Sequence, residues 1–369
     1  MAAGRVAVAM SGGVDSTVAA WLLREQGQEP IGLTLDLAST HPEGAGDRGC
    51  ATTSAAGRSA AVIGMPHHVV DGRALFEERV LRPAWRAYDE GRTPNPCVLC
   101  NQQLKFGLLL EEARRLGIGS LATGHYVRRV EDADGRSRLL RGLDRQKDQS
   151  YFLFALSQEQ LRAALFPLGE LSKPEVRELA RRHGLPGAER AESQDACLAV
   201  GDVTLAEALR QRFGQPGRPG PVEMADGRSL GLHRGIHQFT IGQRRGLGVA
   251  RPQRSYVVGI DPVRAAVVVG DEGALYQHGL IADGVTWADP PGPAELELEV
   301  QIRYRHPAVR ALARVDDDGT RVRLRFEAPQ RAVTPGQAAV FYAGDRLLGG
   351  GWIVGGIHAG GDWFDLSRT

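Results

Sequence analysis

Two groups of side chains in this sequence could carry covalent chemistry. Residues 11–16 read S-G-G-V-D-S, in which glycines allow a tight turn around an anion and serines add hydroxyl donors. Cys97 and Cys100 form a C-x-x-C, and a cysteine thiolate acts as a nucleophile or as a metal ligand. Together these residues predict an enzyme that binds phosphate groups and uses thiol chemistry.

The residues around the S-G-G-V-D-S string place it where a phosphate site belongs. Val6 to Met10 is an unbroken apolar run, typical of a strand buried on both faces. Val14, Val18 and Leu22 then recur at helical spacing up to Gly27. The N-terminus of such a helix offers N–H groups and partial positive charge to an anion. The alternative is a plain glycine-rich turn capped by serine; the Lys-bearing G-x-x-x-x-G-K-[ST] loop does not occur in the sequence.

The cysteines stand among polar residues and prolines. Residues 91–101 read G-R-T-P-N-P-C-V-L-C-N, and the two prolines fix the backbone there. Cys197 ends the string S-Q-D-A-C far along the chain. Four cysteines in 369 residues do not form a disulfide framework and fit a reducing compartment. For Cys50 we expect ordinary apolar packing.

Composition indicates a soluble protein of two or three domains, 42% hydrophobic and 24% charged. Lys and Arg number 45 against 44 Asp and Glu, so a nucleic-acid partner would need a local basic surface. The apolar N-terminal run turns polar at Ser11, and no later run could cross a bilayer. We therefore expect a cytoplasmic protein with no membrane partner.

The first half of the chain alternates predicted strands with predicted helices. Apolar runs predict strands at Ile31–Leu37, His68–Asp71 and Ser120–Val127, and helical periodicity covers residues 73–88 and 102–116. Alternation of this kind predicts a doubly wound α/β domain with a parallel sheet.

After about residue 200 the pattern becomes that of strands. Residues 214–221 and 289–293 are rich in Pro and Gly and predict breaks. Residues 295–305 alternate apolar and charged side chains, with Tyr304 on the apolar face, and residues 321–326 do the same. We expect a small central β-containing domain and a C-terminal β-barrel. The expected domains are 1–200, 201–275 and 276–369.

Longer motifs carry a resemblance to a known family. The S-G-G-V-D-S string resembles the pyrophosphatase loop (PP-loop) of ATP enzymes that adenylate an acceptor oxygen and release pyrophosphate. The other motifs occur here in the order found in bacterial tRNA-specific 2-thiouridylases. They are G-R-T-P-N-P-x-x-x-C-N at 91–101, A-T-G-H-Y at 122–126, L-L-R-G-L-D at 139–144, K-D-Q-S-Y-F-L at 147–153, S-x-x-x-C at 193–197, T-I-G-Q-R-R-G-L-G at 240–248, R-Y at 303–304 and T-P-G-Q-A-A-V-F-Y at 334–342.

The resemblance implies a PP-loop ATP pyrophosphatase domain of the adenine nucleotide alpha hydrolase-like kind, and it implies site residues. Cys100 matches the family nucleophile and Cys197 the cysteine that carries persulfide sulfur. The positions matching the ATP site are Ala9, Met10, Ser11, Gly12, Gly13, Val14, Asp15, Ser16, Leu35 and Gly124. Those matching tRNA contacts are Asn95, Pro96 and Cys97 beside the target uridine, and His125, Lys147, Asp148, Gln149, Arg303, Tyr304 and Gln337.

The implied reaction converts the wobble uridine of tRNA to 2-thiouridine. ATP adenylates O2 of the uridine, and Mg²⁺ is expected to neutralise the departing pyrophosphate. A persulfide on Cys197, loaded by a cysteine desulfurase or a sulfur-relay protein, then supplies sulfur, and Cys100 releases the product with formation of a disulfide.

One departure from the family opens a second route for sulfur. Position 97 is often Asp in the family and is Cys here. Cys97, Cys100 and Cys197 could supply three of the four thiolates that usually hold a [4Fe–4S] cluster. We expect the persulfide route and keep the cluster as its alternative.

Two other functions remain open from the residues alone. Another PP-loop adenylating ligase would need neither the paired cysteines nor a basic C-terminal region. A non-catalytic RNA-binding relative would not need the intact loop. Residues 301–331 hold eight Arg against four acidic residues, which fits phosphate contact or a solvated charged face.

Overall fold

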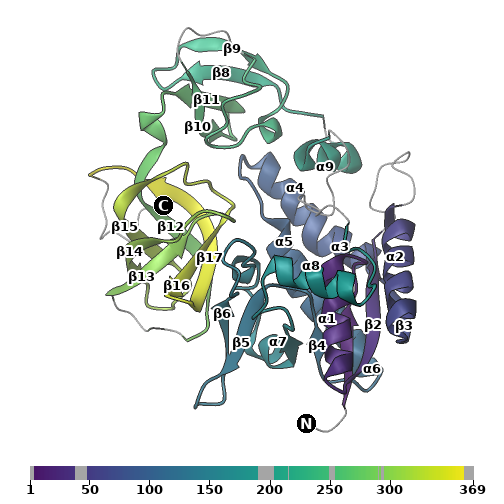
Figure 1. Ribbon diagram of the computed structural model, residues 1–369. Helices are drawn as coiled ribbons and strands as arrows, with labels where there is room; N and C mark the ends of the chain where they lie inside the picture. The colour runs from purple at the N-terminus through teal and green to yellow at the C-terminus, as the bar shows by residue number, and fades with distance from the viewer. Residues whose placement is uncertain are drawn as a thin grey trace. The chain divides into compact units, whose positions relative to one another are not determined.

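The computed structural model of the protein (Figure 1) describes residues 4–37, 48–189, 203–214, 216–248, 254–289, 291 and 295–360, without the side chains of 48–52. The chain divides into two compact units that interleave along the sequence. The first consists of residues 1–80, 96–198 and 345–347, and the second of residues 81–95, 199–344 and 348–369. No helix among the described residues is long and apolar enough to span a membrane.

The first unit is built on a parallel sheet with strand order β3-β2-β1-β4-β7. Its strands are β1 Arg5–Ala9, β2 Glu29–Asp36, β3 His67–Asp71, β4 Leu121–Ala122 and β7 Ala164–Leu165. The central strand β1 carries Val6 and Val8, which are almost completely buried. Strand order reverses between β1 and β4, and ligands of α/β sheets bind at the carboxyl ends of strands at such a switch point.

Helices cover this sheet. They are α1 Val14–Glu25, α2 Arg48–Ile63, α3 Arg73–Phe76, α5 Pro96–Leu99, α6 Leu110–Arg115, α7 Gln158–Ala163 and α8 Lys173–Arg182, with short 3₁₀ turns at Ser150–Phe152 and π-helical stretches at Glu77–Leu81 and Cys100–Leu109. Val18 of α1, Ala60 of α2 and Val176 of α8 belong to one buried cluster with β1. This cluster fixes α1, and with it the loop that precedes α1.

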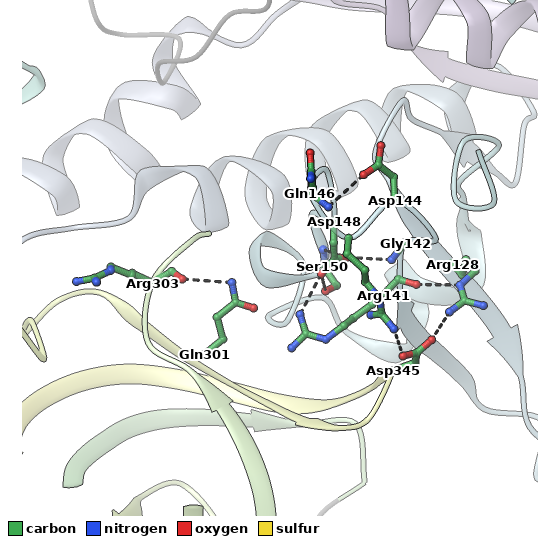
Figure 2. A network of polar contacts seen from close by, with 11 residues as sticks. Arg128, Arg141, Gly142, Asp144, Gln146, Asp148, Ser150, Gln301, Arg303 and Asp345 are labelled. Atoms are coloured by element: carbon green, nitrogen blue, oxygen red, sulfur yellow. Dashed lines mark hydrogen bonds and ion pairs between the residues drawn. The ribbon is translucent and has the colours of Figure 1, made fainter. Parts of the chain in front are cut away.

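A hairpin of β5 Val127–Glu131 and β6 Ser137–Arg141 leaves the parallel sheet. Residues 345–347 pair with it: Arg346 lies opposite Leu140 and donates to Asp132. Asp345 accepts a hydrogen bond from Arg128 at 2.6 Å (Figure 2).

The second unit begins at Leu81, and its first helix is α4 Arg82–Asp89. Its middle part contains α9 Leu205–Phe213 and a four-stranded sheet, β10-β11-β8-β9, formed by β8 Gly220–Met224, β9 Ser229–His233, β10 Tyr256–Asp261 and β11 Ala266–Gly270, with 3₁₀ turns at Ile236–Gln238 and Gly273–Leu275. Arg82 lies over the ring of Phe213, and Trp85 packs against His237. These contacts fasten α4 to the middle part.

The remaining strands close into a barrel, which belongs to the second unit except for Arg346 and Leu347 of its last strand. They are β12 Tyr276–Trp287, β13 Glu295–Gln301, β14 Val309–Val315, β15 Val322–Arg331, β16 Ala338–Ala343 and β17 Arg346–Ile357. The order β12-β15-β14-β13-β16-β17 is closed by pairing of β12 with β17. The interior is filled by apolar side chains such as Val300, Leu324 and Phe341. The predicted fold class, an α/β domain followed by a β-containing middle and a C-terminal barrel, is confirmed.

Two predicted strand boundaries are wrong. The strand predicted at Ser120–Val127 ends at Ala122, and the chain then turns through Gly124 before β5 begins at Val127. The strand predicted at 295–305 ends at Gln301, and Arg305 adopts a positive φ of 63° in the turn that follows. In both places the predicted strand ran past the point where the backbone turns.

Candidate active site

The phosphate loop is a tight turn between β1 and α1. Gly12 has a φ of +72°, and a Cβ there would lie 2.6 Å from the Cβ of Ala55, so the backbone tolerates only glycine. The Ser11 amide donates to Ser16 Oγ at 3.2 Å, and Ser16 Oγ donates to the Gly13 carbonyl at 3.1 Å. The serines therefore hold the turn from within.

The first turn of α1 has no side-chain cap. Gly13 is the N-cap residue, with φ −85° and ψ 163°, and it has no side chain to accept from the first helical N–H groups. Amides at a helix start carry partial positive charge and bind anions when no side chain occupies them. The turn thus has the form of a phosphate cradle.

Gly124 brings a second strand end to this loop. A Cβ on Gly124 would lie 2.8 Å from the Asp15 carbonyl carbon and from the Ser16 amide nitrogen. The structure therefore brings Gly124 against residues 15 and 16, as expected for parts of one site. Leu35 lies half-buried on the neighbouring strand β2.

Lys173 is a functional candidate that the sequence reasoning missed. Its ammonium lies 2.6 and 2.7 Å from the two carboxylate oxygens of Asp15, and the side chain is only 7% exposed. Tyr126 donates its hydroxyl to the same carboxylate at 2.8 Å. Lys173 is the first residue of α8, where a cation opposes the helix dipole. Nothing in the sequence pattern indicated this pairing, because the two residues lie 158 positions apart.

A pocket of about 420 Å³ opens beside the loop. Gly12, Leu185 and Gly187 contribute to its wall, and the exposed Arg58 and Glu189 add one charge of each sign. Among the described residues, no three His, Cys, Asp or Glu side chains gather where they could hold a metal ion.

The C-x-x-C stands at the start of a long helix. Pro96 begins α5, where the missing proline N–H costs nothing. Cys97 and Cys100 are three residues apart on this helix, so their thiols share a face, and both residues are partly exposed. Cys197 lies outside the described residues, as does the side chain of Cys50.

His125 is buried behind the loop. It is 7% exposed, its Nδ1 lies 2.7 Å from the hydroxyl of Thr123, and its ring packs near Phe106 and Phe166. Burial, and then the charge of Lys105, hold its pKa well below the usual value of 6.5. His125 is therefore neutral near pH 7, and its predicted contact with tRNA remains a prediction.

Asp148 organises the turn that carries it (Figure 2). Its Oδ1 accepts from the amides of Gly142 and Ser150 at 3.0 and 3.2 Å. Its Oδ2 accepts from the Ser150 hydroxyl at 2.8 Å and lies 3.2 Å from Arg141 Nη1. The carboxylate is 9% exposed and engaged on both oxygens, so its contribution to RNA binding would be to shape the turn.

Gln149 connects the turn that contains Asp148 to the A-T-G-H-Y loop by hydrogen bonds. Its amide donates to the Tyr126 carbonyl at 3.0 Å, and its Oε1 accepts from the Tyr126 amide at 3.1 Å. Lys147 is partly exposed on the turn itself. The predicted residues 125 and 147–149 thus form one connected group within the first unit.

The remaining predicted RNA contacts lie in the second unit. Arg303 and Tyr304 are in the turn after β13, where Gln301 donates its side-chain amide to the Arg303 carbonyl at 3.2 Å (Figure 2). The Arg305 guanidinium lies 5.4 Å from the Tyr304 ring centre. Gln337 is in the turn before β16, and Asn95 is 8% exposed.

A phosphate-binding turn at the switch point of a parallel sheet, followed by a middle β domain and a barrel, defines a PP-loop protein with two accessory domains. Comparison with known families agrees. Residues 4–201 match the tRNA methyl transferase HUP domain, 207–271 the tRNA methyl transferase PRC-barrel domain, and 277–353 the aminomethyltransferase beta-barrel domain.

Named relatives cover almost the whole chain. The tRNA-specific 2-thiouridylase MnmA of Geotalea uraniireducens is 46% identical over 96% of both chains. That of Syntrophotalea carbinolica is 49% identical over 95% of this chain and 98% of its own. A solved 4-thiouridine synthetase–RNA complex with bound ATP is 19% identical over 57% of this chain and 50% of its own, with a TM-score of 0.35, too weak a likeness to carry a conclusion. The chain belongs to the tRNA-specific 2-thiouridylase family.

Replacement of Lys173 by Met should abolish ATP cleavage with little loss of fold. The variant leaves the Asp15 carboxylate without its cation beside the phosphate loop, so we expect pyrophosphate release in the presence of tRNA to fall roughly 100-fold or more. Arg182→Met, at the exposed end of the same helix, is the matched control. Wild-type release by Lys173→Met would remove Lys173 from the site.

The buried His125 should make stability depend on pH. Because its folded pKa lies below the unfolded value of about 6.5, the unfolded state binds the proton more tightly, and stability falls as the pH drops below that value. His125→Gln should flatten the slope of unfolding free energy between pH 6.5 and 5.5 by up to about 1.4 kcal/mol per pH unit. An equal slope in His125→Gln contradicts the assignment.

Proposed function

We propose that this protein uses ATP to adenylate O2 of the wobble uridine in tRNA and then replaces that oxygen by sulfur, giving 2-thiouridine. The observation that carries the proposal is the phosphate loop at the uncapped start of α1, joined by Gly124 at the sheet's switch point. The partly exposed thiols of the C-x-x-C supply the second half of the chemistry. Membership of the 2-thiouridylase family supports the same assignment.

The loop residues suit the phosphates of ATP. The backbone of 11–16 and the first turn of α1 would hold the leaving pyrophosphate. Mg²⁺ would neutralise the developing charge on the phosphates. Since Asp15 already accepts from Lys173 through both oxygens, the ion would take its ligands mainly from phosphate oxygens and water.

The reaction needs two displacements. O2 of the uridine attacks the α-phosphorus, pyrophosphate leaves, and the oxygen becomes part of an AMP leaving group. The terminal sulfur of a persulfide on Cys197 then attacks C2, and AMP leaves with the former uridine oxygen.

Release of the product needs Cys100. Its thiolate attacks Sγ of Cys197, the bond to the transferred sulfur breaks, and a Cys100–Cys197 disulfide forms. A dithiol reductant must supply two electrons before the next turnover. A cysteine desulfurase or a sulfur-relay protein would reload the persulfide, so we place the reaction in the reducing cytoplasm.

Two of the matched domain families are described as tRNA methyl transferase domains, but the site favours thiolation. Transfer of a methyl group does not require a cradle for the phosphates of ATP. An amide-forming PP-loop ligase would use the cradle but not the C-x-x-C. The combination of the two features in one unit of the chain supports thiolation.

Substitution of the two cysteines provides the direct test. In a reaction with tRNA, ATP and a desulfurase supplied with ³⁵S-cysteine, Cys100→Ala and Cys197→Ala should each lower 2-thiouridine formation roughly 100-fold or more while ATP binding is retained. Cys197→Ala should also lose the ³⁵S label on the protein. Cys50→Ala is the matched control and should retain activity. Full protein labelling of Cys197→Ala would place the persulfide elsewhere.

Cys97 decides between the two sulfur routes. The shared helical face of Cys97 and Cys100 also suits a cluster that would be completed by Cys197. We expect Cys97→Asp, which restores the commoner family residue, to retain most thiolation activity without bound iron. Anaerobic purification, iron analysis and an activity assay measure this. Activity that follows iron content and disappears in Cys97→Asp would replace the persulfide route by the cluster route.

A further inference from the structure

Asp144 closes the L-L-R-G-L-D motif and begins the turn that carries the predicted tRNA contacts at 147–149. We call residues 144–149 the K-D-Q turn. The Asp144 Oδ1 accepts from the Gln146 amide at 3.1 Å (Figure 2), and the Asp144 carbonyl accepts from the Lys147 amide at 3.1 Å. One carboxylate oxygen of Asp144 therefore shapes the turn from within.

The second carboxylate oxygen of Asp144 binds the start of α8. This Oδ2 accepts from the Lys173 amide at 2.9 Å. Lys173 is the first helical residue of α8, and its amide is one of the N–H groups that a helix leaves without an intrahelical partner. The side chain of the same residue reaches the phosphate loop, where its ammonium lies 2.6 Å from Asp15 Oδ1. Lys173 thus joins the K-D-Q turn through its main chain and the phosphate loop through its side chain.

A second route leads from the other end of the turn to the same carboxylate. The Gln149 amide donates to the Tyr126 carbonyl at 3.0 Å, and the Gln149 Oε1 accepts from the Tyr126 amide at 3.1 Å. The Tyr126 hydroxyl donates to Asp15 Oδ1 at 2.8 Å. Because both routes end on Asp15, the K-D-Q turn and the phosphate loop belong to one closed ring of polar contacts within the first unit.

The chain that leads into the K-D-Q turn is closely packed against its neighbours. The Leu143 amide donates to the Gly169 carbonyl at 2.9 Å. A Cβ on Gly142 would lie 2.7 Å from the Tyr126 carbonyl oxygen, and one on Gly169 would lie 2.2 Å from the Val127 carbonyl oxygen. Segments in such close contact transmit a displacement instead of absorbing it.

Ligands at the two ends of this ring would restrict the same contacts. A tRNA bound at the K-D-Q turn would order Asp144 and the start of α8, so that ATP at the phosphate loop has less ordering left to produce. By linkage, ATP would favour tRNA binding by the same factor. We propose that Asp144 is a positioning residue through which tRNA binding and ATP binding strengthen each other. The inference rests on the proposed function for its two ligands.

Asp144→Ser separates the two bonds of the carboxylate. A serine hydroxyl can still accept from the amide two residues further on, but a single short hydroxyl cannot also reach the Lys173 amide. The probe is an ATP analogue with a methylene bridge between the α- and β-phosphates, whose Kd is measured by calorimetry. A saturating tRNA transcript with uridine at the wobble position should tighten its binding about tenfold in the wild type and about twofold or less in Asp144→Ser.

Asp134→Ser is the matched control. Asp134 lies in the turn between β5 and β6, and its Oδ1 accepts from the Arg136 amide at 2.9 Å, which is the same local arrangement in the same unit. The transcript should still tighten binding of the analogue about tenfold in this variant. A general loss of fold would weaken nucleotide binding with and without tRNA alike, so the ratio of the two Kd values isolates the coupling.

Hydrogen exchange gives a second readout that needs no nucleotide. In the wild type the transcript should slow exchange in the peptide that contains the start of α8, because Asp144 holds the Lys173 amide. In Asp144→Ser the transcript should leave that exchange rate unchanged. Should thermal unfolding show that this variant is poorly folded, Asp144→Asn, which keeps the volume and one acceptor oxygen, should show the same loss of coupling.

Three results overturn the inference or the proposed function separately. A ratio of Kd values that stays about tenfold in Asp144→Ser, or an equal loss of the ratio in Asp134→Ser, contradicts the role of Asp144. If the wild type thiolates tRNA but binds the analogue equally well with and without the transcript, the inference fails and the proposed function stands. If the coupling is present but the wild type fails to thiolate tRNA, the proposed function fails and the coupling through Asp144 stands.

Discussion

The ion pair between Asp15 and Lys173 is the interaction on which the site depends. It joins the first turn of α1 to the first residue of α8, and the hydroxyl of Tyr126 completes it. Asp15, Lys173 and Tyr126 come from three different segments of the first unit, and their contact holds these segments together. This contact gives the phosphate loop, the A-T-G-H-Y loop and α8 a common polar anchor. Removal of the Asp15 carboxylate would leave the charge of the nearly buried Lys173 unpaired, which strongly destabilises a folded protein.

Much of this site was predictable because it is local in sequence. The string from Ser11 to Ser16 follows an apolar strand and begins a helix, and those neighbours specify a phosphate turn. Gly124 could be placed with it only through the resemblance to a family. Lys173 could not be placed at all, because 158 residues separate it from Asp15 and nothing in the periodicity of either helix indicates the pairing. The fold class followed from alternating patterns, whereas the strand ends at Ala122 and Gln301 were set by tertiary turns.

Several polar residues predicted to contact RNA also make hydrogen bonds within the protein. Asp148 accepts from amides of its own turn, Gln149 binds the backbone of Tyr126, and Gln337 donates to the carbonyls of Thr93 and Pro94. Such residues are required for RNA binding if the turns they shape present the contacting groups. Motif resemblance alone cannot separate these two roles, because both keep the same residue at the same position. The hydrogen-bond partners establish the structural role, and contact with RNA stays a prediction.

The central claim is that the uridine oxygen leaves on AMP, and an isotope measurement tests it most directly. A tRNA carrying ¹⁸O at O2 of the target uridine would be thiolated with ATP under single-turnover conditions, and the released AMP analysed by mass spectrometry. The account predicts one ¹⁸O atom in the phosphate of each AMP formed with a 2-thiouridine. AMP without ¹⁸O, with the label released to water while 2-thiouridine accumulates, would show that the oxygen is not activated by adenylation and would contradict the account.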